Sequence, residues 1–258
     1  MLIFLINLII WWSMTEEENK NKLIAGVLGG MGPLATVDFM SMVTEFCPIE
    51  KEEDHVRLIV DQNPHIPSRQ IMTSEISAKI ASTLSKSAVN LENIGANFLV
   101  MPCNTAHKFY DLISDAIEIP FLHIVDETVS EISNYFSSKK KVGILATTAC
   151  LRSEIYQSGL KKNDKDFILP DKENQEECMR IIFSIKDEGD LTGLSQSMKK
   201  VAESLIKNGA DIIIAGCTEI PLVLKQEDLG VPVISSTKIL AIRTIEQANK
   251  INIARDYK

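Results

Sequence analysis

The sequence predicts an α/β fold made of two pseudo-symmetric parallel-sheet domains, with the candidate active site in the cleft between them. From Lys22 onward, short β-branched apolar runs alternate almost without interruption with longer segments of helical period. This alternation is typical of parallel strands joined by helices. The chain has 258 residues, which is long enough for one large or two ordinary domains.

An internal near-repeat favours two related halves. Gly26 and Gly143 lie 117 residues apart in similar segments, and Cys103 and Cys217 lie 114 apart in another similar pair. The two offsets nearly agree, so equivalent strand ends are expected to face each other across a cleft. The matching segments are IAGVLGG (24–30) with KVGILATT (141–148), and FLVMPCNT (98–105) with IIIAGCTE (212–219).

Each expected element follows from this periodicity, strands from the apolar runs and helices from the longer amphipathic segments. The expected strands are 23–28, 56–60, 98–101, 121–124, 141–145, 211–215 and 231–234. The expected helices are 33–46, 74–94, 105–117, 126–136, 151–160, 173–186, 192–208 and 236–249. The predicted domains are 22–119 plus 222–258 for the first and 120–221 for the second, after an N-terminal extension over 1–21.

The first twelve residues, MLIFLINLIIWW, are apolar apart from Asn7. This stretch is shorter than the roughly 20 residues that a membrane span needs, and it lacks the features of a secretory signal. We expect a disordered extension or a start site misassigned upstream of Met14, with no stable membrane insertion. A weak membrane or partner anchor is the alternative.

Composition excludes several classes of function. The formal net charge of −8 disfavours binding to nucleic acid or to anionic membranes. Five widely spaced cysteines without a C-x-x-C pair predict free thiols in a reducing, cytoplasmic compartment, rather than disulfides or a zinc site. No metal is therefore expected.

Cys103 and Cys217 occupy matching positions at strand ends. Asn104, Thr105 and His107 follow Cys103, and Thr218 and Glu219 follow Cys217. A thiol at the start of a helix has a lowered pKa, and short polar side chains beside it suit a carboxylate ligand. We therefore predict a reactive pair, with His107 and Glu219 as residues that could tune the thiols or orient a ligand.

A glycine-rich turn, GGMGPLAT at 29–36, follows the first expected strand. It lacks the spacing of nucleotide-binding loops, so we interpret it as a tight turn with Pro33 at the first helical position. Its glycines also let a small ligand approach the backbone near Met31.

The motifs together resemble the aspartate/glutamate racemase family, and within it the branch of aspartate racemases that work without pyridoxal phosphate. The resemblance spans roughly 23–245. It rests on GGMGPLAT (29–36), NPHIPSR (63–69), MPCNTAH (101–107), LATT (145–148) and AGCTEI (215–220).

The resemblance implies racemisation of aspartate without a cofactor, by a protein that forms a homodimer. One cysteine as thiolate would take the α-proton while the other, as thiol, protonates the opposite face. Cys103 would serve the D-enantiomer and Cys217 the L-enantiomer. The implied substrate-binding residues are Met31, Asn104, Thr105 and Thr218 around the α-carboxylate and ammonium, and Arg69 and Lys186 for the side-chain carboxylate.

Other functions remain open from sequence alone. A broad-specificity or glutamate racemase, or a decarboxylase or isomerase using the same cysteines, would share these motifs. From a different class, a two-lobed binding protein would carry a small molecule without chemistry. The paired cysteines argue against this last alternative.

Overall fold

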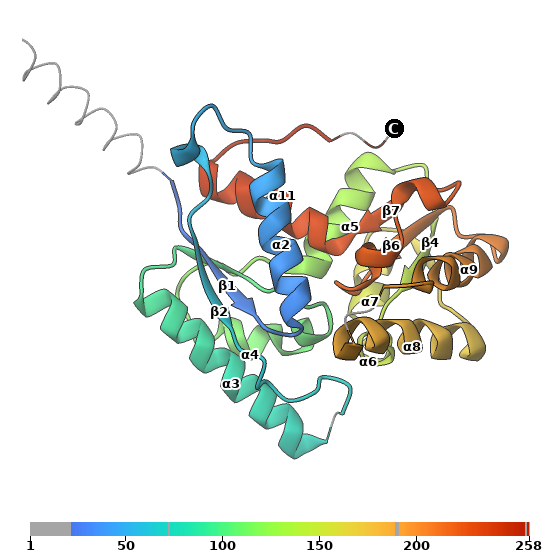
Figure 1. The fold of residues 1–258 in the computed structure, drawn as a ribbon, viewed down its shortest axis with the longest axis horizontal. Coiled ribbons are helices and arrows are strands. Elements are labelled where there is room, and N and C mark those ends of the chain that lie inside the picture. The colour runs from blue at the N-terminus through green and yellow to red at the C-terminus, as the bar shows by residue number, and fades with distance from the viewer. Residues whose placement is uncertain (1–21, 72, 189–190, 256, 258) are drawn as a thin grey trace, which may run out of the picture.

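The computed structural model describes residues 22–71, 73–188, 191–255 and 257, so the predictions for the N-terminal extension lie outside the described residues. Two parallel sheets with covering helices form the molecule, one in each half of Figure 1. The predicted α/β class with two parallel sheets is confirmed.

The first sheet has the strand order β2-β1-β3, from β1 (Ala25–Gly29), β2 (Leu58–Gln62) and β3 (Phe98–Val100). All its strands are parallel, with Ala25 beside both Leu58 and Phe98. Helices α2 (Pro33–Phe46) and α3 (Ser74–Asn93) follow β1 and β2. Pro33 opens α2, as the sequence predicts, because its missing N–H costs nothing at the first helical position.

The second sheet has the order β5-β4-β6-β7. Its strands are β4 (Lys141–Leu145), β5 (Asp166–Ile168), β6 (Ile212–Ala215) and β7 (Val233–Ser235), and all pairings are parallel. The sequence analysis missed β5 because it is a three-residue edge strand that is only partly buried, so it carries little apolar signal.

The remaining helices largely follow the expected order. They are η1 (Glu52–Asp54), η2 (Thr105–Phe109), α4 (Tyr110–Ser114), α5 (Ile124–Tyr135), α6 (Thr148–Arg152), α7 (Ile155–Lys162), α8 (Lys172–Glu188), α9 (Leu194–Lys207), α10 (Ile220–Val223), η3 (Gln226–Asp228) and α11 (Ser236–Asn249).

Three expected elements differ from the structure. The helix expected at 105–117 is a 3₁₀ turn followed by the five-residue α4, and only Phe121 of the strand expected at 121–124 pairs, in a single bridge with Leu99. The helix expected at 151–160 is split into α6 and α7 by Glu154, whose φ of 56° is left-handed. A left-handed residue cannot continue an α-helix.

The strand pairings also correct part of the predicted chain division. β7 lies within 222–258, which was assigned to the first domain, but it pairs with β6 of the second sheet. Conversely, Phe121 was assigned to the second domain but bridges to the first sheet. The chain therefore enters the second half after Phe121 and not at residue 120, and it leaves the second sheet only after Ser235 and not at residue 221. The exact domain boundaries stay a prediction.

The near-repeat corresponds to matching local geometry. A Cβ at Gly26 would come within 2.5 Å of Leu99, and one at Gly143 within 2.6 Å of Ile213. Leu99 N–H donates to the Pro120 carbonyl, and Ile213 N–H donates equivalently to the Pro232 carbonyl. Each glycine thus lets the same neighbouring strand residue pack over its backbone.

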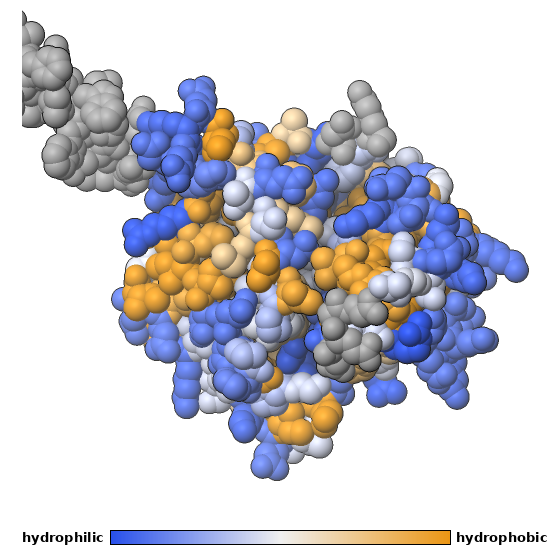
Figure 2. Space-filling model, in the orientation of Figure 1, coloured by the Kyte–Doolittle hydropathy of each residue, from blue (hydrophilic) through white to orange (hydrophobic). Residues whose placement is uncertain are grey.

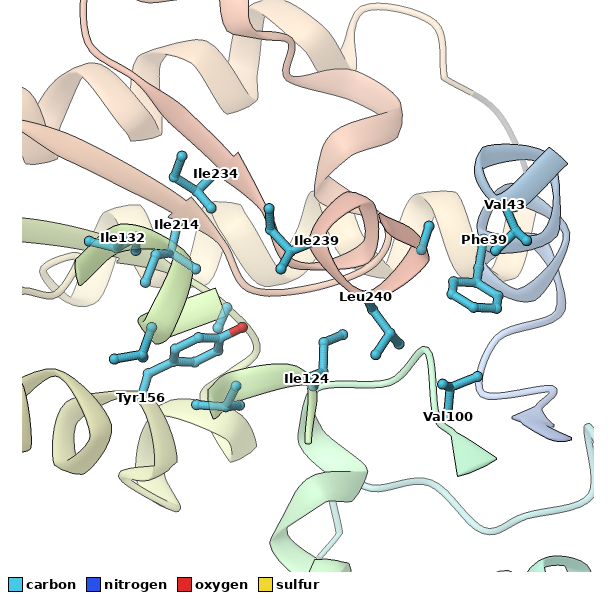
Figure 3. Close-up of a cluster of buried hydrophobic side chains, with 14 of the residues drawn as sticks. Phe39, Val43, Val100, Ile124, Ile132, Tyr156, Ile214, Ile234, Ile239 and Leu240 are labelled. Carbon is cyan, nitrogen blue, oxygen red and sulfur yellow. The ribbon is translucent and has the colours of Figure 1, made fainter. Parts of the chain in front are cut away.

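Helices α5 and α11 join the two halves. Helix α5 follows Phe121, which bridges to the first sheet, and α11 follows β7 of the second sheet. Helix α5 packs against α7, α11 packs against α2, and the two helices pack against each other. Figure 3 shows the resulting cluster, to which α2 contributes Phe39, α5 contributes Ile124 and α11 contributes Leu240. The main hydrophobic core therefore crosses between the halves.

The surface in view carries both polar and apolar regions. Figure 2 shows apolar side chains on and beside α2, where Leu34 and Val37 are about half exposed. Within the part of the chain that the structure describes, no helix is both long and apolar enough to cross a membrane.

Candidate active site

Cys103 lies in a tight loop after β3. Its N–H donates to the Met101 carbonyl at 2.7 Å, which turns the chain sharply before η2. His107 Nδ1 donates to the Cys103 carbonyl at 2.9 Å, and His107 Nε2 accepts the Ile124 N–H at 3.2 Å. The imidazole therefore ties the Cys103 loop to the start of α5.

His107 is neutral in this position. Burial, with a smaller contribution from the neighbouring His123, lowers the pKa of His107 to about 3. Both ring nitrogens are used in hydrogen bonds to the backbone. The imidazole thus holds the loop in place and has no proton to exchange near neutral pH.

Cys217 lies in the equivalent loop after β6, next to the buried carboxylate of Glu219. The Cys217 thiol donates to Glu219 Oε2 at 2.9 Å, and the Thr218 hydroxyl donates to the same oxygen at 3.1 Å. Lys186 Nζ lies 3.2 Å from Glu219 Oε1. The carboxylate thus has a partner on each oxygen, as a buried charge requires.

These contacts shift the pKa of both the thiol and the ammonium. Burial, the negative charge of Glu219 and the hydrogen bond to it raise the pKa of Cys217 well above its usual value, although Lys186 opposes them. Burial alone would lower the pKa of Lys186, but the acidic groups around it, first Cys217 and then Glu219 and Cys103, raise it overall. Cys217 is therefore a protonated thiol beside a charged lysine.

Lys186 and Arg69 face one small pocket between the two halves. Arg69 and Gln70 line it from the first half, and Met179, Ile182, Phe183 and Lys186 line it from α8. Glu219 connects Lys186 to the Cys217 loop, and the Met31 carbonyl connects Arg69 to the glycine-rich turn.

The guanidinium of Arg69 is held by backbone carbonyls. Its Nη2 donates to the Met31 carbonyl at 2.8 Å, and its Nη1 donates to the carbonyls of Pro67 at 3.0 Å and Ile66 at 3.3 Å. Arg69 is thereby fixed beside the glycine-rich turn. Its charge is not neutralised by these neutral partners.

The polar residues after Cys103 cross to the second half. Thr105 Oγ1 lies 2.8 Å from Thr147 Oγ1, at the start of α6. Asn104 donates to Ser236 at 3.0 Å and accepts a hydrogen bond from Tyr156 at 2.6 Å. The two halves are thus joined by buried hydrogen bonds directly beside the cysteine.

Of the predicted site residues, Arg69 and Lys186 line the pocket itself. Cys103, Asn104, Thr105, His107, Cys217, Thr218 and Glu219 lie in the two strand-end loops, and Met31, Arg69 and Lys186 connect to them through the contacts above. The sequence analysis missed Thr147, Tyr156 and Ser236. Thr147 belongs to the repeated LATT segment and was within reach of the sequence, whereas nothing local marks the other two.

One part of the electrostatic expectation is wrong. The sequence analysis placed each cysteine before a helix whose dipole lowers its pKa. The structure has a 3₁₀ turn after Cys103 and the four-residue α10 after Cys217, and the pKa of Cys217 is raised. Helices this short contribute little dipole, so burial and Glu219 dominate.

The other three cysteines are buried and do not line the pocket. All five cysteines are free thiols. Burial raises the pKa of Cys178 to about 12, and burial followed by the charge of Cys103 raises the pKa of Cys150 further still. Among residues 22–71, 73–188, 191–255 and 257, no group of three or more His, Cys, Asp or Glu side chains is placed to hold a metal ion.

Comparison with known proteins supports the resemblance. The family model for Asp/Glu/hydantoin racemases matches residues 28–244. The broad specificity amino-acid racemase RacX of Bacillus subtilis is 33% identical over 226 residues, which cover 85% of this chain and 96% of RacX.

Solved structures are similar over nearly the whole described fold. An aspartate racemase from Picrophilus torridus is 30% identical with a TM-score of 0.74, covering 88% of this chain and 94% of that one. A putative Asp/Glu racemase from Yersinia pestis is 28% identical with a TM-score of 0.76, covering 88% and 99%. The two-sheet architecture is thus shared with these proteins.

Proposed function

Since this chain is a member of the Asp/Glu/hydantoin racemase family, and hence an amino-acid racemase, we propose that it interconverts L- and D-aspartate with Cys103 and Cys217 as the two acid–base groups. The observation that carries the proposal is the shared pocket. The loops of both cysteines, one from each half, reach residues that line it: Thr105, two residues after Cys103, lies 2.8 Å from Thr147, and Glu219, two residues after Cys217, lies 3.2 Å from Lys186.

Two cysteines on opposite walls supply the chemistry of racemisation. A thiolate on one wall takes the α-proton, so a C–H bond breaks and an S–H bond forms. The thiol on the other wall then gives its proton to the opposite face of the same carbon. The proton count of the enzyme is unchanged, and only the position of the thiolate moves from one wall to the other.

In this scheme no cofactor withdraws electrons from the substrate, so polar groups beside the cysteines stabilise the negative charge that forms on it. Removal of the α-proton places negative charge on the substrate carboxylate, so hydrogen-bond donors there stabilise the transition state. We assign this role to Asn104, Thr105 and Thr218, with the turn at Met31. No pyridoxal phosphate and no metal takes part in this scheme.

The two cations of the pocket favour an acidic substrate. Arg69 has its charge uncompensated by its carbonyl partners, and a guanidinium pairs well with a carboxylate. A substrate carboxylate between Arg69 and Lys186 would also relieve the repulsion that Arg69 exerts on Lys186. The aspartate side chain provides such a group.

Broad specificity is the second candidate, and a specific observation favours it. Lys186 is already paired with Glu219, and Met179, Ile182 and Phe183 line the same pocket with apolar surface. Such a wall accepts neutral side chains. The similarity to RacX, named as a broad specificity racemase, points in the same direction.

Proton exchange with solvent tests the function directly. The purified protein, without added pyridoxal phosphate, is incubated in deuterium oxide with L- or D-aspartate. Deuterium is expected at Cα of both enantiomers, and Cys103→Ser or Cys217→Ser is expected to abolish racemisation, because neither thiol reaches both faces. Cys178→Ser serves as the control. Wild-type protein that leaves the substrates unlabelled, or full activity in Cys217→Ser, would overturn the proposal.

Arg69→Ala tests the substrate. We expect kcat/KM for aspartate to fall about 100-fold and that for alanine or serine to fall far less, because a charge-assisted pair is lost. Arg57→Ala, at an exposed arginine, is the matched control. Equal losses for acidic and neutral substrates would favour broad specificity instead.

A further inference from the structure

A buried chain of hydrogen bonds connects the loops of the two cysteines. Ser236 Oγ donates to the Ala215 carbonyl at 3.0 Å, two residues before Cys217. Asn104 Nδ2, directly after Cys103, donates to Ser236 Oγ at 3.0 Å. The Tyr156 hydroxyl then donates to Asn104 Oδ1 at 2.6 Å. Tyr156, Ser236 and Asn104 are all at least 98% buried.

The donor and acceptor of each hydrogen bond in this series follow from the bond between Ser236 and Ala215. A carbonyl oxygen only accepts hydrogen bonds, so the single proton of the Ser236 hydroxyl points at Ala215. Ser236 is then left as an acceptor, so the nitrogen of the Asn104 amide faces it and the amide oxygen faces Tyr156. Tyr156 supplies the proton that this oxygen requires.

The neighbouring hydroxyls do not compete for this arrangement. Ser236 and Thr128 both lie next to the Tyr156 hydroxyl, but the proton of Ser236 goes to the Ala215 carbonyl and that of Thr128 goes to the Ile124 carbonyl at 2.7 Å. The Tyr156 proton is therefore free to bind Asn104. Figure 3 shows the ring of Tyr156 at the edge of the cluster of α5, β6 and β7, with its hydroxyl directed toward the interior.

We propose that Tyr156 and Ser236 are positioning residues, which fix the Asn104 amide so that its remaining N–H is presented to the substrate carboxylate. This inference rests on the proposed function. A flipped amide would present its oxygen to an anionic group instead. Because the carboxylate gains charge as the α-proton leaves, the correctly oriented N–H stabilises the transition state more than the bound substrate.

The same hydrogen bonds also join the two halves of the molecule. Tyr156 belongs to α7 of the second half, Asn104 follows β3 of the first half, and Ser236 opens α11. One amide group is therefore bonded to elements of both halves. Its orientation is fixed only when the two cysteine loops are held together.

Tyr156→Phe tests the proposal because it keeps the ring in the core and removes only the hydroxyl. We expect kcat for aspartate to fall about tenfold with a smaller change in KM, as for the loss of an interaction made mainly in the transition state. Ser236→Ala is expected to act in the same direction. The pH dependence of kcat/KM is expected to stay unchanged, because neither residue exchanges protons with substrate.

Tyr110→Phe is the matched control. It loses a tyrosine hydroxyl as well, one that donates to the backbone carbonyl of Phe121 at 2.7 Å. The Tyr110 ring, which the variant keeps, stacks on His107, and the hydroxyl it loses bonds to none of the residues that line the pocket. We expect its kcat to equal that of the wild type. A loss of kcat in Tyr110→Phe equal to that in Tyr156→Phe would assign the effect to general destabilisation and overturn the proposal.

A double-mutant cycle separates positioning from packing. The remaining activity of the Asn104→Ala variant is measured as the slow exchange of the substrate α-proton with solvent. Adding Tyr156→Phe to this variant is expected to cause no further loss of the exchange rate. An equal loss in both backgrounds would overturn the inference. If the wild type racemises and needs both cysteines while Tyr156→Phe and Ser236→Ala keep full kcat, only this inference fails. A wild type without proton exchange would remove the proposed function, and this inference with it.

Discussion

At the scale of single residues, the two cysteines differ in their surroundings although their loops are equivalent. The Cys217 thiol donates to the buried Glu219 carboxylate, whereas the Cys103 loop is held by the neutral imidazole of His107. Position 219 is Glu where the first half has Thr105 at the equivalent place, three residues after Gly216 and Pro102 respectively. The Glu219 carboxylate, which has no counterpart beside Cys103, therefore keeps the Cys217 thiol protonated in the absence of a ligand.

Glu219→Gln is predicted to make Cys217 more acidic. The variant removes the carboxylate charge that raises the pKa of the thiol and frees the Lys186 ammonium to pair with a thiolate. Alkylation of Cys217 by iodoacetamide, followed across pH by peptide mass spectrometry, is expected to have its midpoint at lower pH than in the wild type. Glu177→Gln, which changes a carboxylate paired with Arg180 on α8, is the control. An unchanged or higher midpoint in Glu219→Gln would contradict this account.

At the scale of elements, the C-terminal segment after α11 completes an ion-pair cluster around α5. Arg255 Nε lies 2.6 Å from Glu131 Oε1, and Arg243 Nη2 lies 3.0 Å from Glu131 Oε2. The Tyr257 hydroxyl also binds Glu131, and Arg255 binds Glu246 of α11 at 2.9 Å. Since Glu131 is fully buried, its charge depends on these partners.

Arg255→Ala is predicted to lower the free energy of unfolding by about 3 kcal/mol, because it leaves a buried carboxylate with one cation fewer. Urea denaturation at neutral pH measures the change. Arg180→Ala, which removes a bidentate pair with Glu177 that is largely exposed, is expected to cost less than about 1 kcal/mol. Similar losses in the two variants would show that the C-terminal segment contributes no more than a surface pair.

At the scale of the whole molecule, the two halves share one hydrophobic core. The main cluster contains Val27 and Phe98 from the first sheet together with Val142 and Ile214 from the second, linked through α5 and α11. Because each of these helices packs against the half other than the one it follows, neither half keeps a complete core without the other. The predicted homodimer concerns a further level of assembly and stays a prediction.

The shared core predicts a single cooperative unfolding transition. Calorimetry is expected to show one peak whose calorimetric and van't Hoff enthalpies agree, since loss of either half exposes the core of both. Gly230→Ala, where a Cβ would meet no atom within 4 Å, is expected to leave the midpoint unchanged, whereas Gly143→Ala, crowded by Ile213, is expected to lower it without splitting the peak. Two separated transitions would mean that the halves fold independently.

The sequence by itself determined the fold class, the near-repeat, the two cysteines and the polar residues beside them, because these are local: periodicity, strand-end position and motif order are all written along the chain. Only the tertiary structure decided that Lys186 pairs with Glu219, that Glu219 keeps Cys217 protonated, and that Tyr156 and Ser236 orient Asn104. These contacts join residues 33 to 132 positions apart, or depend on burial that folding creates. Ion pairs and hydrogen bonds of this kind form only when separate elements pack, so no local sequence pattern predicts them.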